Sequence, residues 1–248
     1  MIKRNFKSCQ NLVNNMINAL TILLPPKAAP KVNYSVSENQ KVISDRYSRT
    51  PILILLFSFF IFNLSFAQEG YKDSIQQLRV MHAAELLDPQ TKLLSDEERD
   101  HFQGLDYFQV DTNSIVLAQF EYNKGKKFKM QTSTDRMPIY RRYGYVYFTW
   151  KSEPCTLTVY QNIELSKKAE YKDYLFIPFR DGTSGQESYG GGRYLDLRQT
   201  NSATMLLDFN LAYNPYCAYS INYSCPVPPA ENTLKVRIEA GEKTPLGH

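Results

Sequence analysis

The sequence predicts a mainly β protein, an antiparallel β-sandwich or barrel-like domain with a short helical cap at its N-terminal side. After residue 104, ten short segments alternate between apolar and polar residues, and no helical pattern interrupts them. Turn signals such as Asn123-Lys124-Gly125 and Asp181-Gly182 separate these segments. An aromatic share of 13% and a hydrophobic share of 43% also suit Tyr-rich strands around a core.

A polar, basic leader over residues 1–50 precedes the apolar segment 51–67. Of the 29 Lys/Arg and 25 Asp/Glu of the chain, 8 and 2 lie in residues 1–67, which leaves 21 and 23 for the remainder. The formal net charge of +4 therefore belongs to the leader, and the rest of the chain lacks the basic surface of a nucleic-acid-binding protein.

The segment 51–67 has the three-part layout of a secretory signal peptide. Arg46 and Arg49 precede about a dozen apolar residues, and Ser65-Phe66-Ala67 is a small-x-small cleavage signal. A spanning helix needs roughly 20 apolar residues. We therefore expect export, with a periplasmic or extracellular protein after cleavage near Ala67. The 50 residues upstream suggest a translation start assigned too early. The alternative is an uncleaved membrane anchor. In that case we expect this segment to be the only part of the protein that contacts the membrane.

Residues 68–104 predict the helical cap. Apolar residues recur at helical spacing until Pro89 ends the pattern. Ser95 and Glu98 form a capping box that begins a second helix through Phe102, and Gly104 follows it. The lone His82 on the first helix fits a packed residue better than a ligand.

The β domain is predicted over residues 105–248. Its expected strands are Tyr107–Val110, Ile115–Tyr122, Lys127–Thr132, Pro138–Tyr143, Tyr145–Lys151, Cys155–Gln161, Tyr174–Phe179, Arg193–Leu197, Ala203–Phe209 and Leu234–Glu239.

The candidate site lies where the Arg193 strand, the Asp208 strand and the Pro-rich loop 214–232 meet, because constrained loops often carry function. Arg193 follows the glycine turn 190–192, where a guanidinium can grip a carboxylate or phosphate. The alternative is a salt bridge to an aspartate, for which the candidates are Asp181, Asp196 and Asp208.

The thiols of the β domain are Cys155, Cys217 and Cys225. In an exported protein, Cys217 and Cys225 are close enough in sequence to form a disulfide. Free thiols and a metal site are the alternatives, although a structural zinc site needs four Cys/His ligands. Cys155 lies in an alternating strand and is expected in the core. We expect no metal and no cofactor.

Several motifs together resemble the bacterial family of domains of unknown function numbered 1684. They are Phe102-Gln-Gly-Leu-Asp-Tyr-Phe108, Tyr189-Gly-Gly-Gly-Arg-Tyr-Leu195, Asp208-Phe-Asn-Leu-Ala-Tyr-Asn-Pro215, Cys217-Ala-Tyr219, Ser224-Cys-Pro-Val-Pro-Pro229, Asn232 and Ala240-Gly-Glu242. The resemblance runs from about Tyr71 to Lys243. It implies a mostly β domain, often exported, with no assigned activity.

Three hypotheses for function remain open. The first is a binding module for a small anionic or carbohydrate ligand. In this module Arg193 clamps an anion, and the other ligand-binding candidates are Tyr189, Asp208, Asn210, Asn214, Tyr219 and Asn232. The second is a hydrolase that uses Asp208 with Asp181 or Asp196 as acid and base. The third gives all these residues a structural role, with Arg193 and Asp208 as a buried ion pair.

Overall fold

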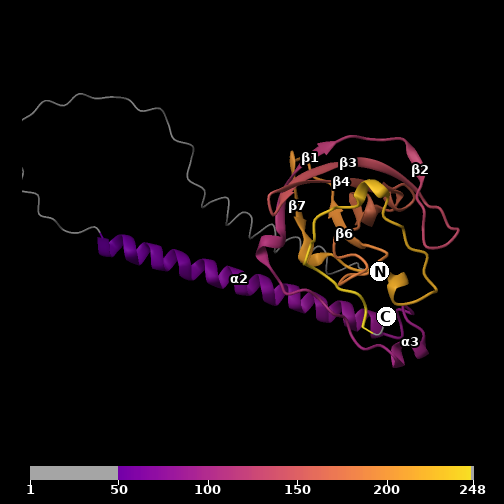
Figure 1. Ribbon diagram of the computed structural model, residues 1–248, viewed down its shortest axis with the longest axis horizontal. Coiled ribbons are helices and arrows are strands. Elements are labelled where there is room, and N and C mark those ends of the chain that lie inside the picture. Colours follow the sequence, from indigo (N-terminus) through magenta and orange to yellow (C-terminus); the bar gives the residue numbers. More distant parts are fainter. Residues whose placement is uncertain (1–49, 247–248) are drawn as a thin grey trace, which may run out of the picture. The chain divides into compact units, whose positions relative to one another are not determined.

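The computed structural model describes residues 50–246, with side chains from residue 68 onward (Figure 1). The predicted leader lies outside the described residues except for Thr50. Helix α2, Thr50–Leu87, includes the predicted signal peptide, whose side chains are likewise outside the description. Within the described residues, no helix combines the length and apolarity needed to cross a membrane. The chain divides into two compact units, residues 1–76 and 77–248.

The predicted helical cap is confirmed in its main features. Helix α2 ends at Leu87, before Pro89. Helix α3, Asp96–Asp100, begins with the expected capping box: Glu98 N donates to Ser95 Oγ at 3.2 Å, and Ser95 N donates to Glu98 Oε2 at 2.7 Å. This second helix ends two residues before the predicted Phe102.

The second unit contains one seven-stranded, wholly antiparallel sheet in the order β6-β5-β4-β3-β1-β7, with β2 paired to β3. The sheet is curled into half of a barrel, which confirms the barrel-like form of the prediction (Figure 1). The strands are β1 (Ile115–Tyr122), β2 (Lys127–Lys129), β3 (Ile139–Trp150), β4 (Glu153–Asn162), β5 (Tyr174–Phe179), β6 (Arg193–Arg198) and β7 (Thr204–Asp208).

Short 3₁₀ helices connect the strands and follow the last of them. They are η1 (Thr112–Ser114), η2 (Leu165–Lys167), η3 (Ala169–Tyr171), η4 (Phe209–Leu211), η5 (Tyr216–Ala218) and η6 (Ala230–Asn232).

Two predicted strands, Pro138–Tyr143 and Tyr145–Lys151, are in fact the single strand β3. The register against β4 shifts between Arg142 and Gly144, which marks a β-bulge. A Cβ on Gly144 would lie 2.3 Å from the backbone oxygen of Glu121, so only glycine fits here. Sequence reasoning took this bulge for a break between strands.

The predicted strands Tyr107–Val110 and Leu234–Glu239 were wrong. The first forms only an isolated bridge between Tyr107 and Glu242. The second is an irregular segment whose backbone bonds to a loop: Leu234 N donates to Arg180 O and Gly182 N donates to Val236 O, both at 2.8 Å. These hydrogen bonds satisfy the polar backbone groups of the segment without pairing it into the sheet.

Alternation along each strand divides the buried residues into two clusters on opposite faces of the sheet. In β6, Leu195 and Leu197 join the larger cluster and Tyr194 joins the smaller one. The C-terminal segment adds Ile238, fully buried, to the larger cluster. This segment closes over the core from outside the sheet and carries several groups of the candidate site.

Candidate functional site

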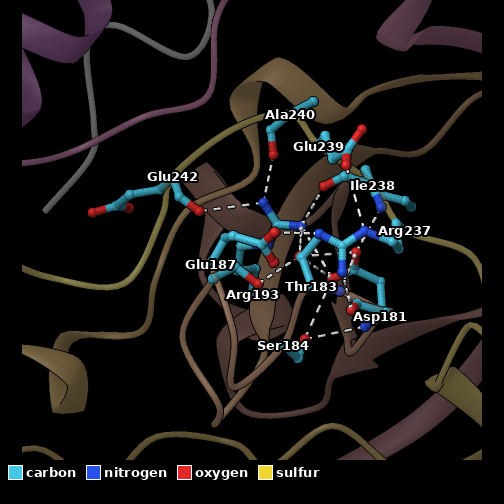
Figure 2. Close-up of polar contacts among 12 residues, drawn as sticks. Asp181, Thr183, Ser184, Glu187, Arg193, Arg237, Ile238, Glu239, Ala240 and Glu242 are labelled. Carbon is cyan, nitrogen blue, oxygen red and sulfur yellow. Dashed lines mark hydrogen bonds and ion pairs between the residues drawn. The ribbon is translucent and has the colours of Figure 1, made fainter.

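Arg193 begins β6, and its guanidinium lies wholly inside the domain (Figure 2). Nη1 donates to the carbonyls of Ala240 and Glu242, and Nη2 donates to the carbonyl of Ile238 at 2.9 Å. Nη2 also forms an ion pair with Asp181 Oδ1 at 3.1 Å. Burial lowers the pKa of Arg193, while the charge of Asp181 opposes this shift. Both terminal nitrogens of the guanidinium are thus used within the protein.

The carboxylate of Asp181 is bound by several donors besides Arg193. Ile238 N donates to its Oδ2 at 2.6 Å, Thr183 Oγ1 donates at 3.0 Å, and Ser184 Oγ donates to Oδ1 at 3.3 Å. The hypothesis of a buried Arg193–Asp208 ion pair therefore had the wrong partner. The salt-bridge alternative itself is confirmed, with Asp181 as the acid.

The glycine turn before Arg193 brings the backbone close to neighbouring segments. Gly192 N donates to Tyr189 O at 3.0 Å, and Gly192 has a φ of 89°. A Cβ on Gly192 would lie 2.6 Å from Phe179 O and 2.7 Å from Pro228 Cγ. This residue must be glycine both for its backbone conformation and for the space around it.

Asp208 and Asn210 hold the end of β7 against the loop before β1. Asp208 Oδ1 accepts from Asn210 N at 3.0 Å and from Asn210 Nδ2 at 3.1 Å. Asn210 Oδ1 accepts from Asp111 N at 3.0 Å, and Asn210 Nδ2 donates to Asp111 O at 2.8 Å. The buried amide of Asn210 thus bonds to both backbone groups of Asp111, as a neighbouring strand would do.

Asn232 acts in the same way between β4 and β5. These strands pair only at Tyr160 and Phe176. The fully buried Asn232 accepts from Thr158 N at 2.7 Å and donates to Thr158 O at 2.9 Å and to Pro178 O at 2.8 Å. Its side chain therefore replaces backbone hydrogen bonds that the two strands do not make with each other.

Asp196 lies on the face of β6 opposite to Arg193. Its Oδ1 accepts from Tyr174 OH at 2.6 Å and from Tyr213 OH at 2.8 Å, and burial raises its pKa. The three aspartates of the hydrolase hypothesis, Asp181, Asp196 and Asp208, are thus held by different sets of donors. Among the described residues, no group of three or more His, Cys, Asp or Glu side chains could hold a metal ion.

Asn214 and Tyr219 belong to a buried polar cluster around Glu242. Asn214 Nδ2 donates to Tyr219 OH at 3.2 Å and to Lys243 O at 2.6 Å, and Asn214 N donates to Glu242 Oε2 at 2.8 Å. Two acceptors in this cluster, Glu242 Oε1 and Asn214 Oδ1, are buried and have no hydrogen-bond donor within the part of the chain that the structure describes. Burial raises the pKa of Glu242 to about 8, against the hydrogen bonds from Asn214 and the charge of Arg193.

His82 and Tyr107 lie beside this cluster. The hydroxyl of Tyr107 is 3.3 Å from His82 Nδ1, and the guanidinium of Arg79 lies 4.3 Å from the centre of the Tyr107 ring. Burial lowers the pKa of His82 to about 4, so the imidazole is neutral at pH 7. Burial also raises the pKa of Tyr107, and the charge of Glu242 adds to this. Glu242, Tyr107 and His82 were not among the predicted site residues, and the family motif ending in Glu242 was the available signal.

The thiols of Cys217 and Cys225 lie side by side and are both free in the structure. Cys217 N donates to Cys225 Sγ at 3.2 Å. Tyr189 and Ser133 are within hydrogen-bonding range of the Cys217 sulfur. The predicted disulfide stays a prediction, because the structure contains the reduced pair. Cys155 is buried in the core, as expected.

The predicted site residues therefore fall into separate groups. Asn214 joins Tyr219, and Tyr189 joins the two thiols. Arg193, Asn210 and Asn232 each hold a different part of the fold together.

The comparisons with known proteins give a family and a fold without an activity. A solved structure of an uncharacterised protein from Haloarcula marismortui is similar at 35% identity, with a TM-score of 0.56, over 73% of this chain and 98% of that chain. Among curated proteins, no sequence matches the chain. The family described as "Protein of unknown function (DUF1684)" matches residues 100–243, which is more than half of the chain. The chain therefore belongs to the DUF1684 family.

Proposed function

We propose that the β domain is a small-molecule binding module whose ligand carries hydroxyl groups, as a carbohydrate or polyol does. The observation that carries this proposal is the pair of buried acceptors without donors, Glu242 Oε1 and Asn214 Oδ1. A buried polar atom left unsatisfied costs about 1–3 kcal/mol. A ligand whose hydroxyl groups pair with both atoms would recover much of this free energy.

The chemistry of Glu242 favours a hydroxyl group over a cation. With a pKa of about 8, the side chain is mostly a neutral carboxylic acid at pH 7 and both donates and accepts. A hydroxyl group can also do both, so it matches Glu242 in either protonation state. A cation would require the ionised form, which burial disfavours.

Aromatic rings beside the cluster supply apolar surface for a sugar ring. Tyr219 contacts Asn214 through its hydroxyl, and its ring lies edge-on to Phe102 with centroids 6.5 Å apart. Tyr107 is half-buried next to Glu242. Tyrosine combines a flat apolar ring with a polar tip, which suits a ligand that has both kinds of surface.

The anionic form of the binding hypothesis has less support. Arg193 was its anion clamp, and this guanidinium is fully buried among three backbone carbonyls and Asp181. Of its nitrogens, only Nε lacks an acceptor among the described residues, and a phosphate or carboxylate that bound the terminal nitrogens would have to displace Asp181 from the interior. We therefore favour the carbohydrate form.

A thermal-shift screen of the protein against mono- and disaccharides, polyols, organic acids and phosphates tests the proposal. A ligand at 100 times its dissociation constant adds about 2.7 kcal/mol to the free energy of unfolding. We expect saturable stabilisation by a hydroxylated compound, lost in Asn214→Ala and kept in Asn201→Ala, which makes the same change at an exposed position. Glu242→Gln should keep most of the affinity, since the amide resembles the neutral acid.

Two outcomes would overturn the proposal. One is stabilisation by anions alone, which would favour the hypothesis that an arginine binds an anionic ligand. The other is a sugar response that survives in Asn214→Ala, which would place the binding site elsewhere. A screen with no response would indicate that bound water satisfies the unpaired acceptors, and it would favour the hypothesis that these residues have a structural role.

A further inference from the structure

Cys217 and Cys225 are held together by two different parts of the fold. Cys217 lies in η5, Tyr216–Ala218. Cys225 precedes Pro226, which bridges to Thr132, and Ser133 N donates to Cys225 O at 2.8 Å. The donation from Cys217 N to Cys225 Sγ at 3.2 Å joins these two parts. The two sulfurs therefore meet in the folded state because of long-range pairing, besides their closeness in sequence.

The two thiols differ in exposure. Cys217 is half-buried, whereas Cys225 is 8% exposed and packs in the smaller core cluster. A reagent in solution therefore reaches Cys217 first. Cys155 offers a comparison within the same chain, since it is 7% exposed and lies in β4.

The surroundings favour the thiolate of Cys217. Hydrogen bonds from Cys225, Ser133 and Tyr189 lower the pKa of Cys217 to about 6, although burial opposes them. Cys225 donates to the Cys217 sulfur, and this interaction, together with burial, raises the pKa of Cys225. The thiolate is the reactive form of cysteine. One accessible thiolate thus lies beside one protonated, buried thiol.

We propose that Cys217 and Cys225 form a reversible dithiol–disulfide couple that reacts with low-molecular-weight disulfides, with Cys217 as the attacking thiol and Cys225 as the resolving thiol. The Cys217 thiolate attacks one sulfur of the disulfide R–S–S–R, forms a mixed disulfide and releases one thiolate, RS⁻. Cys225 then loses its proton to this released thiolate or to water and attacks Cys217 Sγ. A second RS⁻ leaves, so two electrons have passed from the cysteines to the reagent.

Tyr189 is a positioning residue in this couple. Its hydroxyl lies within hydrogen-bonding range of the Cys217 sulfur and stabilises the thiolate. Tyr189→Phe should leave the fold intact and raise the pH at which Cys217 becomes reactive. A merely structural tyrosine would not change this pH profile.

The first measurement needs no variant of the pair. Iodoacetamide is reacted with the reduced full-length protein from pH 5 to 9, and the modification of each cysteine is followed by peptide mass spectrometry. We expect Cys217 to react with a midpoint near pH 6. At pH 6 it should react about tenfold faster than an ordinary thiol, since greater ionisation outweighs lower intrinsic nucleophilicity. Cys155 should stay almost unmodified, because burial raises its pKa.

The second measurement follows oxidation by glutathione disulfide. The wild type should form the Cys217–Cys225 disulfide, which dithiothreitol reverses. Cys225→Ser should accumulate a mixed disulfide with glutathione on Cys217, while Cys217→Ser should leave Cys225 unmodified. Cys155→Ser is the matched control and should behave as the wild type does. Circular dichroism verifies that each variant is folded.

Several results would overturn the couple. One is a midpoint at pH 8 or above for the reaction of Cys217 with iodoacetamide. This measurement uses the wild type alone, so it does not depend on the folding of a variant. Another is that glutathione modifies the remaining cysteine equally in the two variants, that is, Cys225 in Cys217→Ser and Cys217 in Cys225→Ser. A disulfide that resists dithiothreitol in the folded protein would show a permanent structural bond in place of a reversible couple.

Discussion

Replacing Glu242 with glutamine should change how the stability of the domain depends on pH. The carboxyl group of Glu242 has a pKa of about 8 in the folded protein, against an ordinary value of 4.5. Between these values the folded state holds a proton that the unfolded state has lost. The free energy of unfolding therefore falls as pH rises through this window.

His82 contributes the opposite slope at lower pH. Its pKa is about 4 in the folded protein, against 6.5 ordinarily, so the unfolded state holds the extra proton between those values. This histidine makes the free energy of unfolding rise with pH up to about pH 6.5. The two effects nearly cancel between about pH 4.5 and 6.5. Above that range Cys217 opposes Glu242, because its pKa is about 6 in the folded protein against 9.0 ordinarily, so its ionisation makes the free energy of unfolding rise with pH.

The wild type should therefore stay nearly level between pH 6.5 and 8, because Glu242 lowers and Cys217 raises the free energy of unfolding by about 2 kcal/mol each, at about 1.4 kcal/mol per proton and pH unit. Glu242→Gln cannot ionise, so it should gain stability by about 1.4 kcal/mol per unit from pH 4.5 to 8, first through His82 and then through Cys217. The charge neighbours Arg79 and Arg193 are present in both proteins. The difference between the two profiles thus reports the ionisation of Glu242.

Urea unfolding at a series of pH values measures these profiles through tryptophan fluorescence. Trp150 is the only tryptophan of the chain, and its indole is buried, with Nε1 donating to Arg237 O at 2.9 Å. Parallel profiles for the wild type and Glu242→Gln from pH 6.5 to 8 would refute the raised pKa. They would also contradict the neutral form of Glu242 on which the binding proposal relies.

Two further predictions concern stability. Arg193→Met should cost about 3–5 kcal/mol, because Asp181 stays buried without its partner, and adding Asp181→Asn should recover part of the loss; a single-variant cost below about 1 kcal/mol in urea unfolding would contradict the internal ion pair. Asn232→Ala should cost about 2–4 kcal/mol because it leaves Thr158 N without an acceptor, and hydrogen exchange should be fastest at β4 and β5. Exchange that rises equally throughout the sheet would argue against a local bridge.

Local pattern was enough to locate most of the sheet. The predicted limits of β1 and β5 agree with the structure because both segments are rich in β-branched and aromatic residues and are followed by turn signals. The bulge in β3 was missed because it depends on contact with β1 through Gly144. The segment 234–239 was predicted as a strand because its composition is typical of strands, but it follows an irregular path over the core.

The candidate site was harder to predict because its partners are far apart in sequence. Arg193 was recognised as important, but its carbonyl acceptors lie 45 to 49 residues away along the chain, and no local pattern identifies a backbone carbonyl as the acceptor. Glu242 follows a glycine in a polar stretch that reads as exposed surface, yet it is fully buried. Only the three-dimensional structure shows that this carboxyl group has an oxygen without a donor.

The segment 228–243 has a consequence for how the protein is made. Asn232 joins β4 to β5, and the carbonyls from Ile238 to Glu242 surround Arg193. A chain that ends at residue 227 contains every strand of the described sheet, but Arg193 and the gap between β4 and β5 are still open to water. The domain therefore cannot close until residues up to about 242 have joined the fold, and until then its open core is exposed to aggregation.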